Sequence, residues 1–205
     1  MTEKRPTRRE IAAEATRQEI LKAARRLFAE HGYANTSIQQ IAAESGVAVQ
    51  TIYSSVGAKA ALVLALNDLI DAEAGVAELA ADIAQESNAS RLLAKAVHLT
   101  RQLNERCGDI VRVVLSAEPA EPEAAAAYAD GMRRHQQGAT DLGQRLASLG
   151  ALARGTSAEQ ASTAFSMMTS PASWQQLTQD AGWSFDEAED WVTRSLAKLL
   201  IGRRH

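Results

Sequence analysis

Residues 36–59, TSIQQIAAESGVAVQTIYSSVGAK, contain two short helical patterns separated by one glycine. In the first pattern, Ile38, Ile41 and Ala42 have the i, i+3, i+4 spacing of a single apolar helix face. Gly46 follows this face, at a position where a left-handed glycine can end a helix without steric cost. Because so short a turn makes two helices cross steeply, the stretch predicts a helix-turn-helix.

The two helices of this stretch have different predicted faces. Thr36 and Gln39 have the spacing of a capping box, so we expect the first helix to begin at Thr36. In the second helix the apolar positions are Val47, Ile52 and Val56. Another face of that helix carries Val49, Gln50, Thr51, Tyr53 and Ser54. Uncharged donors of this kind can hydrogen-bond phosphates and base edges, although an ordinary amphipathic hairpin with a solvated polar side has the same pattern.

The composition of the 205-residue chain favours an all-α fold. Hydrophobic residues make up 46% of the sequence and aromatic residues only 4%, and alanine is abundant. No apolar run approaches the roughly 18 residues of a membrane helix, and residues 1–10 lack the apolar core of a secretory signal. Cys107 is alone, which excludes an intrachain disulfide and favours a reducing compartment. We therefore expect a soluble, cytoplasmic protein.

The charges are distributed unevenly along the chain. Residues 1–59 hold nine Lys or Arg against six Glu, whereas the remaining residues carry 13 basic and 19 acidic groups. A basic N-terminal part on an acidic body suits a protein that binds a polyanion at one end, with chance clustering as the alternative. Residues 1–10 are predicted to be a flexible basic arm, which either contacts phosphates or the minor groove or serves as a solubilising terminus.

A long helix is predicted over residues 11–31, ended by Gly32, and its pattern continues into the stretch described above. Residues 16–66 resemble the N-terminal domain of the tetracycline-repressor (TetR) family of transcription regulators. The shared pattern is I-x3-A-x2-L-F-x3-G-Y, then T-S/T-I-x2-I-A-x2-[AS]-G-V, then T-x-Y and K-x2-L. The matching residues are Ile20, Ala24, Leu27, Phe28, Gly32, Tyr33, Thr36, Ser37, Ile38, Ile41, Ala42, Ser45, Gly46, Val47, Thr51, Tyr53, Lys59 and Leu62.

The resemblance implies a homodimer whose third helix, here about residues 48–55, enters the major groove. It implies phosphate contacts by Thr36 and Ser37 at the start of the second helix, where free amides and the helix dipole favour an anion. It further implies that the Tyr53 hydroxyl and the Lys59 ammonium each contact a phosphate.

Candidates for the base edges are Gln50, Thr51 and Ser54, with Ala48 and Val49 available for a thymine methyl. Gln50 is the strongest of these because its amide can pair bidentately with adenine.

Two features of this chain depart from the family pattern. Residues 53–56 read Tyr-Ser-Ser-Val, where the family often shows Y-x-Y/H-F, and Val56 can fill the core position of the phenylalanine. The third helix also has no Arg or Lys, so no arginine on it can read guanine. Specificity is then expected to depend on dimer spacing, DNA shape and the N-terminal arm.

The sequence predicts an arm at residues 1–10, a helix-turn-helix DNA-binding domain at 11–57 (with the motif at about 36–55) and a larger helical ligand-sensing and dimerisation domain at 58–205. Gly108 is expected to break one helix of the body, and Pro171 to break or kink another. The predicted body helices cover residues 58–74, 88–106, 110–117, 124–148, 158–168 (extended past Pro171 towards 178) and 185–200.

Trp174, Trp183 and Trp191 bring large apolar area late in the chain. The resemblance implies that the C-terminal helices form a homodimer interface, and an intrachain core is the alternative place for these tryptophans. It also implies a small-molecule effector, for which no pocket residues are predicted.

The predicted function is a dimeric repressor released from a palindromic double-stranded DNA operator by a small-molecule effector, nucleoid-associated when bound. A helical enzyme with an accessory DNA-binding head is a rival, but the chain has no H-E-x-x-H, G-x-S-x-G or phosphate-loop motif. A nonspecific architectural DNA-binding protein is a second rival, which a net charge of −3 disfavours. No catalytic residue, cofactor or metal ligand is predicted.

Overall fold

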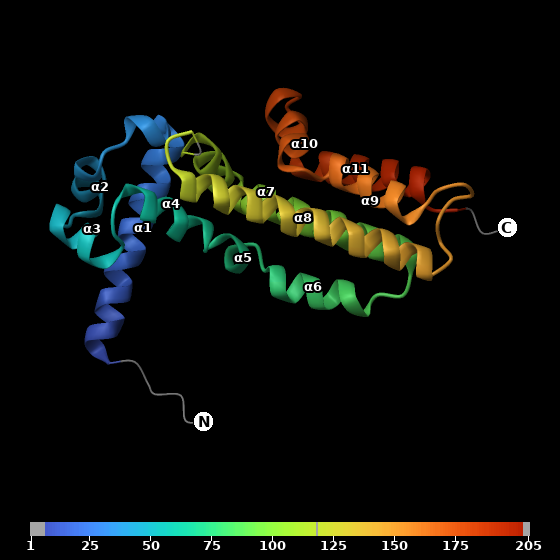
Figure 1. Ribbon diagram of the computed structural model, residues 1–205, viewed down its shortest axis with the longest axis horizontal. Coiled ribbons are helices and arrows are strands. Elements are labelled where there is room, and N and C mark those ends of the chain that lie inside the picture. The colour runs from blue at the N-terminus through green and yellow to red at the C-terminus, as the bar shows by residue number, and fades with distance from the viewer. Residues whose placement is uncertain (1–6, 118, 203–205) are drawn as a thin grey trace. The chain divides into compact units, whose positions relative to one another are not determined.

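The computed structural model describes residues 7–117 and 119–202, and every regular element in these ranges is a helix (Figure 1). The only pairing of extended backbone among the described residues is an isolated antiparallel bridge between Leu152 and Ile201. The predicted all-α fold is therefore confirmed. The helices are α1 (Arg8–Asn35), α2 (Ile38–Ser45), α3 (Val49–Ser55), α4 (Lys59–Asn67), α5 (Ile70–Glu73), α6 (Val76–Gln85), α7 (Ala89–Ala117), α8 (Pro122–Ser148), α9 (Ala158–Met168), α10 (Pro171–Gln175), the π-helical turn η1 (Gln176–Asp180) and α11 (Phe185–Leu200).

The chain forms two compact units. The first unit comprises residues 1–69 and 109–128, and the second comprises residues 70–108 and 129–205. Helices α7 and α8 contribute residues to both units. Over the described residues, no single helix is long and apolar enough to cross a membrane, and only α3 and α4 taken together, bent by 51°, reach that length and hydropathy.

In the first unit, α1 packs against α2, α3 and α4. The predicted apolar positions meet in the core between these helices, where each large buried side chain contributes about 1.5–3 kcal/mol relative to exposure. The fully buried members include Ile20, Phe28, Ile41, Ile52 and Leu62.

Helix α1 is longer than predicted at its N-terminus. It begins at Arg8 because Thr7 and Glu10 form a capping box in which each satisfies the backbone N–H of the other. Its regular turns are interrupted at Gly32, which has a φ of 78° that a residue with a side chain adopts only with strain. The predicted end of the helix is therefore confirmed, and the following Tyr33 is buried, with 4% of its surface exposed.

The cap of α2 differs from the prediction by one residue. The capping box joins Ser37 and Gln40, not Thr36 and Gln39. The Thr36 side chain is turned inward, where its hydroxyl donates to the carbonyls of Leu27 at 3.2 Å and Gly32 at 2.9 Å. Because Thr36 closes the end of α1, the next hydroxyl in the chain serves the free amides of α2.

Two predicted helix boundaries in the body are wrong. Residues 58–74 form two helices, because the chain turns at Leu69, whose N–H donates to the Leu66 carbonyl at 3.1 Å. Conversely, Gly108 does not break α7. A glycine inside a helix costs about 1 kcal/mol relative to alanine, which the burial of the neighbouring Cys107 and Ile110, both with 0% exposure, outweighs.

Helix α6 was not predicted, although its sequence contains a signal. Val76, Leu79 and Ile83 have the i, i+3, i+7 spacing of a helix face. Gly75, with a φ of 66°, is the N-cap of this helix, so the glycine that follows the predicted helix 58–74 begins another helix. Ile83 packs against the core of the second unit.

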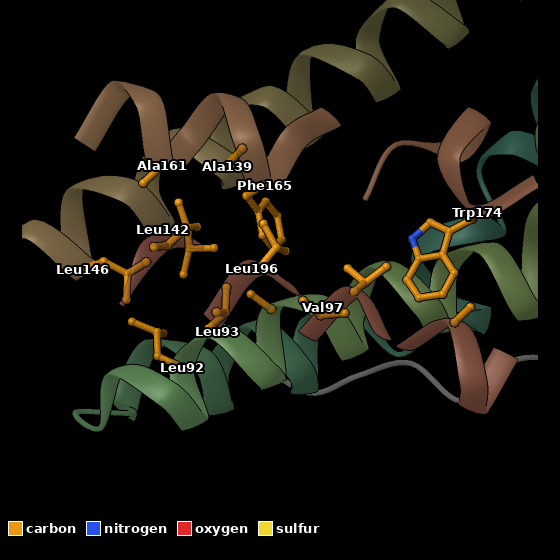
Figure 2. Close-up of a cluster of buried hydrophobic side chains, with 14 residues drawn as sticks. Leu92, Leu93, Val97, Ala139, Leu142, Leu146, Ala161, Phe165, Trp174 and Leu196 are labelled. Carbon is orange, nitrogen blue, oxygen red and sulfur yellow. The ribbon is translucent and has the colours of Figure 1, made fainter. Parts of the chain in front are cut away.

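The core of the second unit is built from α7, α8, α9, α10 and α11 (Figure 2). Trp174 is only 1% exposed, and its indole N–H donates to the Thr100 hydroxyl at 3.3 Å, so this tryptophan belongs to the intrachain core. Trp183 and Trp191 instead form an edge-to-face pair with ring centroids 5.7 Å apart. The residues of this core with 0% exposure are Leu92, Leu93, Val97, Ala139, Leu146, Ala188, Val192 and Leu196.

The C-terminal helices have the predicted bounds. Helix α9 ends at Met168, and Pro171 is the first residue of α10, where its missing N–H costs no hydrogen bond. Helix α11 spans Phe185–Leu200 and begins with a capping box between Ser184 and Glu187. The predicted break at Pro171 is confirmed.

Candidate nucleic-acid interface

Helix α3 is fixed to the first unit by one side and exposed on another. Ile52, with 0% exposure, packs in the core between α3 and its neighbours. The guanidinium of Arg17 on α1 donates to the Ser55 carbonyl at the end of α3, at 3.3 Å. Gln50, Tyr53 and Ser54 are exposed. The polar face predicted from the sequence is therefore presented to solvent by a helix whose position is set on its opposite side.

The three residues proposed for base edges lie on α3 with Val49, one of the two proposed for a thymine methyl; the other, Ala48, is the exposed N-cap of this helix. Gln50 is exposed, and within the described ranges its amide has no hydrogen-bond partner. Ser54 is also exposed, and its hydroxyl donates to the Thr51 carbonyl at 3.1 Å, which leaves the oxygen able to accept. Thr51 and Val49 are half-buried. Gln50 is therefore exposed with both a donor and an acceptor available.

The predicted phosphate contacts lie in three different environments. Tyr53 is 49% exposed, so its hydroxyl is accessible to a partner. Ser37 is half-buried and its hydroxyl accepts from the Gln40 N–H at 3.2 Å as part of the α2 cap. Thr36 is 2% exposed, and its hydroxyl is directed into the fold. The side chain of Thr36 therefore holds the α1–α2 junction, and its contact with a phosphate stays a prediction.

Lys59 is the first residue of α4, next to a helix start that has no side-chain cap. Its ammonium lies over the face of the Tyr33 ring, 4.0 Å from the ring centroid, where the ring quadrupole attracts a cation. Partial burial lowers the pKa of Lys59, and the negative charge of Glu121 opposes that shift. The cation and the free amides of α4 form a site suited to an anion.

Tyr33 connects this site to a segment far away in the sequence. Its hydroxyl donates to the carboxylate of Glu121, the residue immediately before α8. Burial, followed by the interaction with Glu121, raises the pKa of Tyr33 well above its usual value. In the sequence, residues 118–123 read EPAEPE, which predicts an acidic proline turn and no contact with Tyr33. Because 88 positions separate the two residues, no local pattern could reveal their contact.

Two arginines of α1 are paired within the first unit. Arg25 makes a bidentate contact with Asp109, at 2.5 Å from Nε and 2.7 Å from Nη2. This contact lowers the pKa of Asp109 against the opposing effect of burial. Arg26 pairs with Glu44 of α2. The charges of these two arginines are thus compensated within the fold.

Groups of three or more His, Cys, Asp or Glu side chains placed to hold a metal ion do not occur among the described residues. The candidate interface comprises the α3 face, the helix starts on either side of it and Lys59.

Residues 20–66 match the sequence profile of the family described as bacterial regulatory proteins, tetR family. The match runs from the core position Ile20 of α1 to Leu66 of α4, and it includes the whole of α2 and α3. The sequence matches none of the curated proteins significantly.

Solved structures share the fold over nearly the whole chain. A protein from Saccharomonospora viridis in complex with choline aligns with a TM-score of 0.76 at 23% identity, covering 93% of this chain and 100% of that chain. NalD, the secondary repressor of the MexAB-OprM multidrug efflux pump in Pseudomonas aeruginosa, aligns with a TM-score of 0.72 at 21% identity, covering 93% and 98%.

The transcriptional regulator FadR from Bacillus subtilis, in complex with stearoyl-CoA, aligns with a TM-score of 0.68 at 19% identity, covering 87% of this chain and 96% of that chain. At identities of this size the alignments show a common fold. The family resemblance and the fold inferred from the sequence are both confirmed.

Proposed function

We propose that this chain, whose residues 20–66 form a DNA-binding domain of the tetR family, is a dimeric transcriptional regulator that reads a palindromic operator through α3. The observation that carries the proposal is the exposed polar face of α3 on a helix held from behind by Ile52 and Arg17. A face of this kind, on a helix that fits the major groove, supplies the donors and acceptors that distinguish base pairs.

In this proposal the side chains divide into base-edge contacts and the phosphate contacts that the family resemblance implies. Gln50 pairs with adenine, and Thr51, Ser54 and Val49 contact neighbouring base edges and methyl groups. Tyr53 and Lys59 bind phosphates on the two sides of the groove, and the Ser37 end of α2 approaches another phosphate. Phosphate contacts fix register and affinity, whereas Gln50 supplies most of the sequence preference.

The C-terminal helices support a homodimer. Met167 on α9 is 68% exposed, and Trp191 and Leu199 on α11 are 42% and 55% exposed. Large apolar side chains at the surface of two neighbouring helices are typical of a covered interface. A two-fold dimer presents two copies of α3 to half-sites about one helical turn of DNA apart, which is why the operator is palindromic.

A small-molecule effector controls operator binding in this proposal. Two proteins of the same fold were crystallised in complex with choline and with stearoyl-CoA, and NalD is a repressor. The effector binds the second unit and prefers one spacing of the two DNA-binding domains. A ligand with equal affinity for both spacings would not shift the equilibrium. Repression is the default activity, and the chain itself catalyses no reaction.

Selection of binding sites from random duplexes tests the proposal. The purified protein is mixed with a pool of random double-stranded DNA, bound duplexes are recovered and amplified, and the enriched sequences are read. We expect a palindrome with half-sites one helical turn apart, and a Gln50→Ala variant that enriches it less. Recovery of duplexes without any shared palindrome would contradict the proposal and favour a nonspecific architectural protein.

A further inference from the structure

Tyr33, Lys59 and Glu121 form a cluster in the first unit from three separate segments: the end of α1, the start of α4 and the residue before α8. The Tyr33 hydroxyl donates to the Glu121 carboxylate, and the Lys59 ammonium lies 4.0 Å from the centroid of the same ring. Tyr33 therefore contacts an anion at its hydroxyl and a cation at its face.

We propose that Glu121 is a positioning residue that sets the strength of the Lys59 phosphate contact, because its carboxylate competes with a DNA phosphate for the same ammonium. The inference rests on the proposed DNA-binding function. It adds that Glu121, a residue outside the helix-turn-helix, controls the affinity for DNA. Glu121 acts through Tyr33 and Lys59 and does not itself touch DNA.

The anchoring of Glu121 supports a fixed position for this carboxylate. Its backbone N–H donates to the Ala117 carbonyl at 3.0 Å, which ties it to the end of α7. Its carbonyl accepts from the N–H groups of Ala124 at 3.0 Å and Ala125 at 3.2 Å, which ties it to the start of α8. Tyr33 is buried and Glu121 is half-buried, so their hydrogen bond is shielded from water.

Lys59 is attracted from two directions in the free protein. The ring face of Tyr33 and the charge of Glu121 both stabilise the ammonium, and the effect of Glu121 opposes the lowering of the Lys59 pKa by burial. When the Lys59 ammonium binds a DNA phosphate, it gives up part of its attraction to the Tyr33 ring and to Glu121. Glu121 thus weakens binding to every DNA sequence alike, because phosphates carry no base identity.

The cluster also connects two parts of the chain. Glu121 lies between α7 and α8, the two helices that contribute residues to both units. A change in the position of this connection alters the attraction on Lys59 without altering the reading face of α3. Affinity and sequence preference are therefore adjusted by different residues.

The test compares Glu121→Gln with Glu123→Gln. Both variants remove one negative charge, but Glu123 is exposed in the first turn of α8, whereas glutamine at 121 keeps an acceptor for the Tyr33 hydroxyl. We expect Glu121→Gln to bind the selected operator and an unrelated duplex more tightly by a similar factor, about fivefold at low salt. Glu123→Gln should change either affinity less than twofold.

A Lys59→Ala background separates the proposed route from a general charge effect. Adding Glu121→Gln to Lys59→Ala should leave affinity unchanged, because the competing cation is absent. Equal affinities of Glu121→Gln and Glu123→Gln, or a gain that persists in the Lys59→Ala background, would overturn the inference while selective operator binding by the wild type still stands.

A second measurement needs no DNA. Nuclear magnetic resonance titration of the Lys59 side chain should show a lower pKa in Glu121→Gln than in the wild type, because the attractive charge is lost. The same titration in Glu123→Gln should follow the wild type. An unchanged Lys59 pKa in Glu121→Gln would overturn the inference even if no operator were found.

Discussion

Helices α2 and α3 of the first unit have eight and seven residues, whereas α9 and α11 of the second unit have 11 and 16. The short helices are held by a left-handed glycine, a capping box and a few core side chains. Most of their positions therefore accept only a few residue types. The longer helices need only a repeated apolar face, which many sequences supply. The function of the chain is therefore more readable in the first unit than in the second.

The two units also use charge differently. In the first unit, Arg25 and Arg26 are paired with acids inside the fold, and the half-buried Lys59 lies over the Tyr33 ring at the start of α4. In the second unit, Arg101 contacts Glu105, Asp186 and Glu189, a network that joins α7 to the α11 region. The first arrangement leaves a cation for a partner, and the second satisfies cations internally.

The largest expected effect is in the core of the second unit. Replacing Trp174 by alanine should lower the free energy of unfolding by about 3–5 kcal/mol, because a buried aromatic is removed and the Thr100 hydroxyl loses its donor. Denaturant unfolding followed by circular dichroism measures this change. Trp191 is 42% exposed, so Trp191→Ala should lower the free energy of unfolding of the monomer clearly less. Equal losses would contradict the assignment of Trp174 to the core.

Two glycines of α8 should respond in opposite directions to alanine. A Cβ at Gly143 would lie 2.2 Å from the Ser162 hydroxyl and 2.4 Å from the Ala158 carbonyl of α9, so Gly143→Ala should destabilise by about 1–3 kcal/mol. At Gly138 a Cβ meets no atom within 4 Å, and Gly138→Ala should stabilise the helix by about 0.5–1 kcal/mol. Thermal unfolding of both variants checks the signs, and a stabilised Gly143→Ala would refute the close approach of α8 and α9.

Each unit has a helix with the same capping box, so matched variants can separate effects on stability from effects on DNA binding. Ser37 with Gln40 and Ser157 with Gln160 form the same capping box on α2 and α9. Each serine-to-alanine change should lower the free energy of unfolding by about 1 kcal/mol. Only Ser37→Ala should also weaken operator binding, because α2 belongs to the proposed interface. If Ser157→Ala lost DNA binding while remaining folded, the claim that only the α2 cap affects operator binding would be contradicted.

The smallest effect concerns a carboxylate of the second unit. Hydrogen bonds from Arg91, followed by the Asn88 N–H, lower the pKa of Glu86 to about 2. Since the folded-state pKa lies below the unfolded value of about 4.3, the ionised Glu86 stabilises the fold above that value and the benefit is lost as the pH falls towards 2.

Melting temperatures of Glu86→Gln and the wild type should therefore differ at pH 7 and converge at acid pH. Asp190→Asn, which removes a carboxylate paired with Arg194 at the surface, serves as the control and should change the melting temperature little at either pH. A constant difference for Glu86→Gln across the pH range would show that its ionisation is not responsible.

Much of the first unit could be predicted because its signals are local. The glycines at 32 and 46 and the apolar stripe of α1 fix helix ends and faces within a few residues. The predicted cap of α2 is wrong by one residue. The Thr36 hydroxyl donates to the carbonyls of Leu27 and Gly32, and no local sequence pattern indicates these contacts. That choice depends on how α1 ends, a contact between separate elements.

The second unit and the contact between Tyr33 and Glu121 were less predictable. Gly108 was expected to break a helix, because its intrinsic cost is visible in the sequence while the burial of Ile110 is not. Glu121 was seen only as part of an acidic turn, since its partner Tyr33 is 88 positions away. Features that depend on contacts between distant segments need the structure.

Binding affinities of wild type, Gln50→Ala and Lys59→Ala, measured over a salt series on the selected operator and an unrelated duplex, test the central claim most directly. We expect Gln50→Ala to lose about 1–3 kcal/mol of preference per half-site with an unchanged salt slope. Lys59→Ala should weaken binding to both duplexes and reduce the slope by about one per subunit. Equal slopes for wild type and Lys59→Ala, together with undiminished preference in Gln50→Ala, would contradict the account.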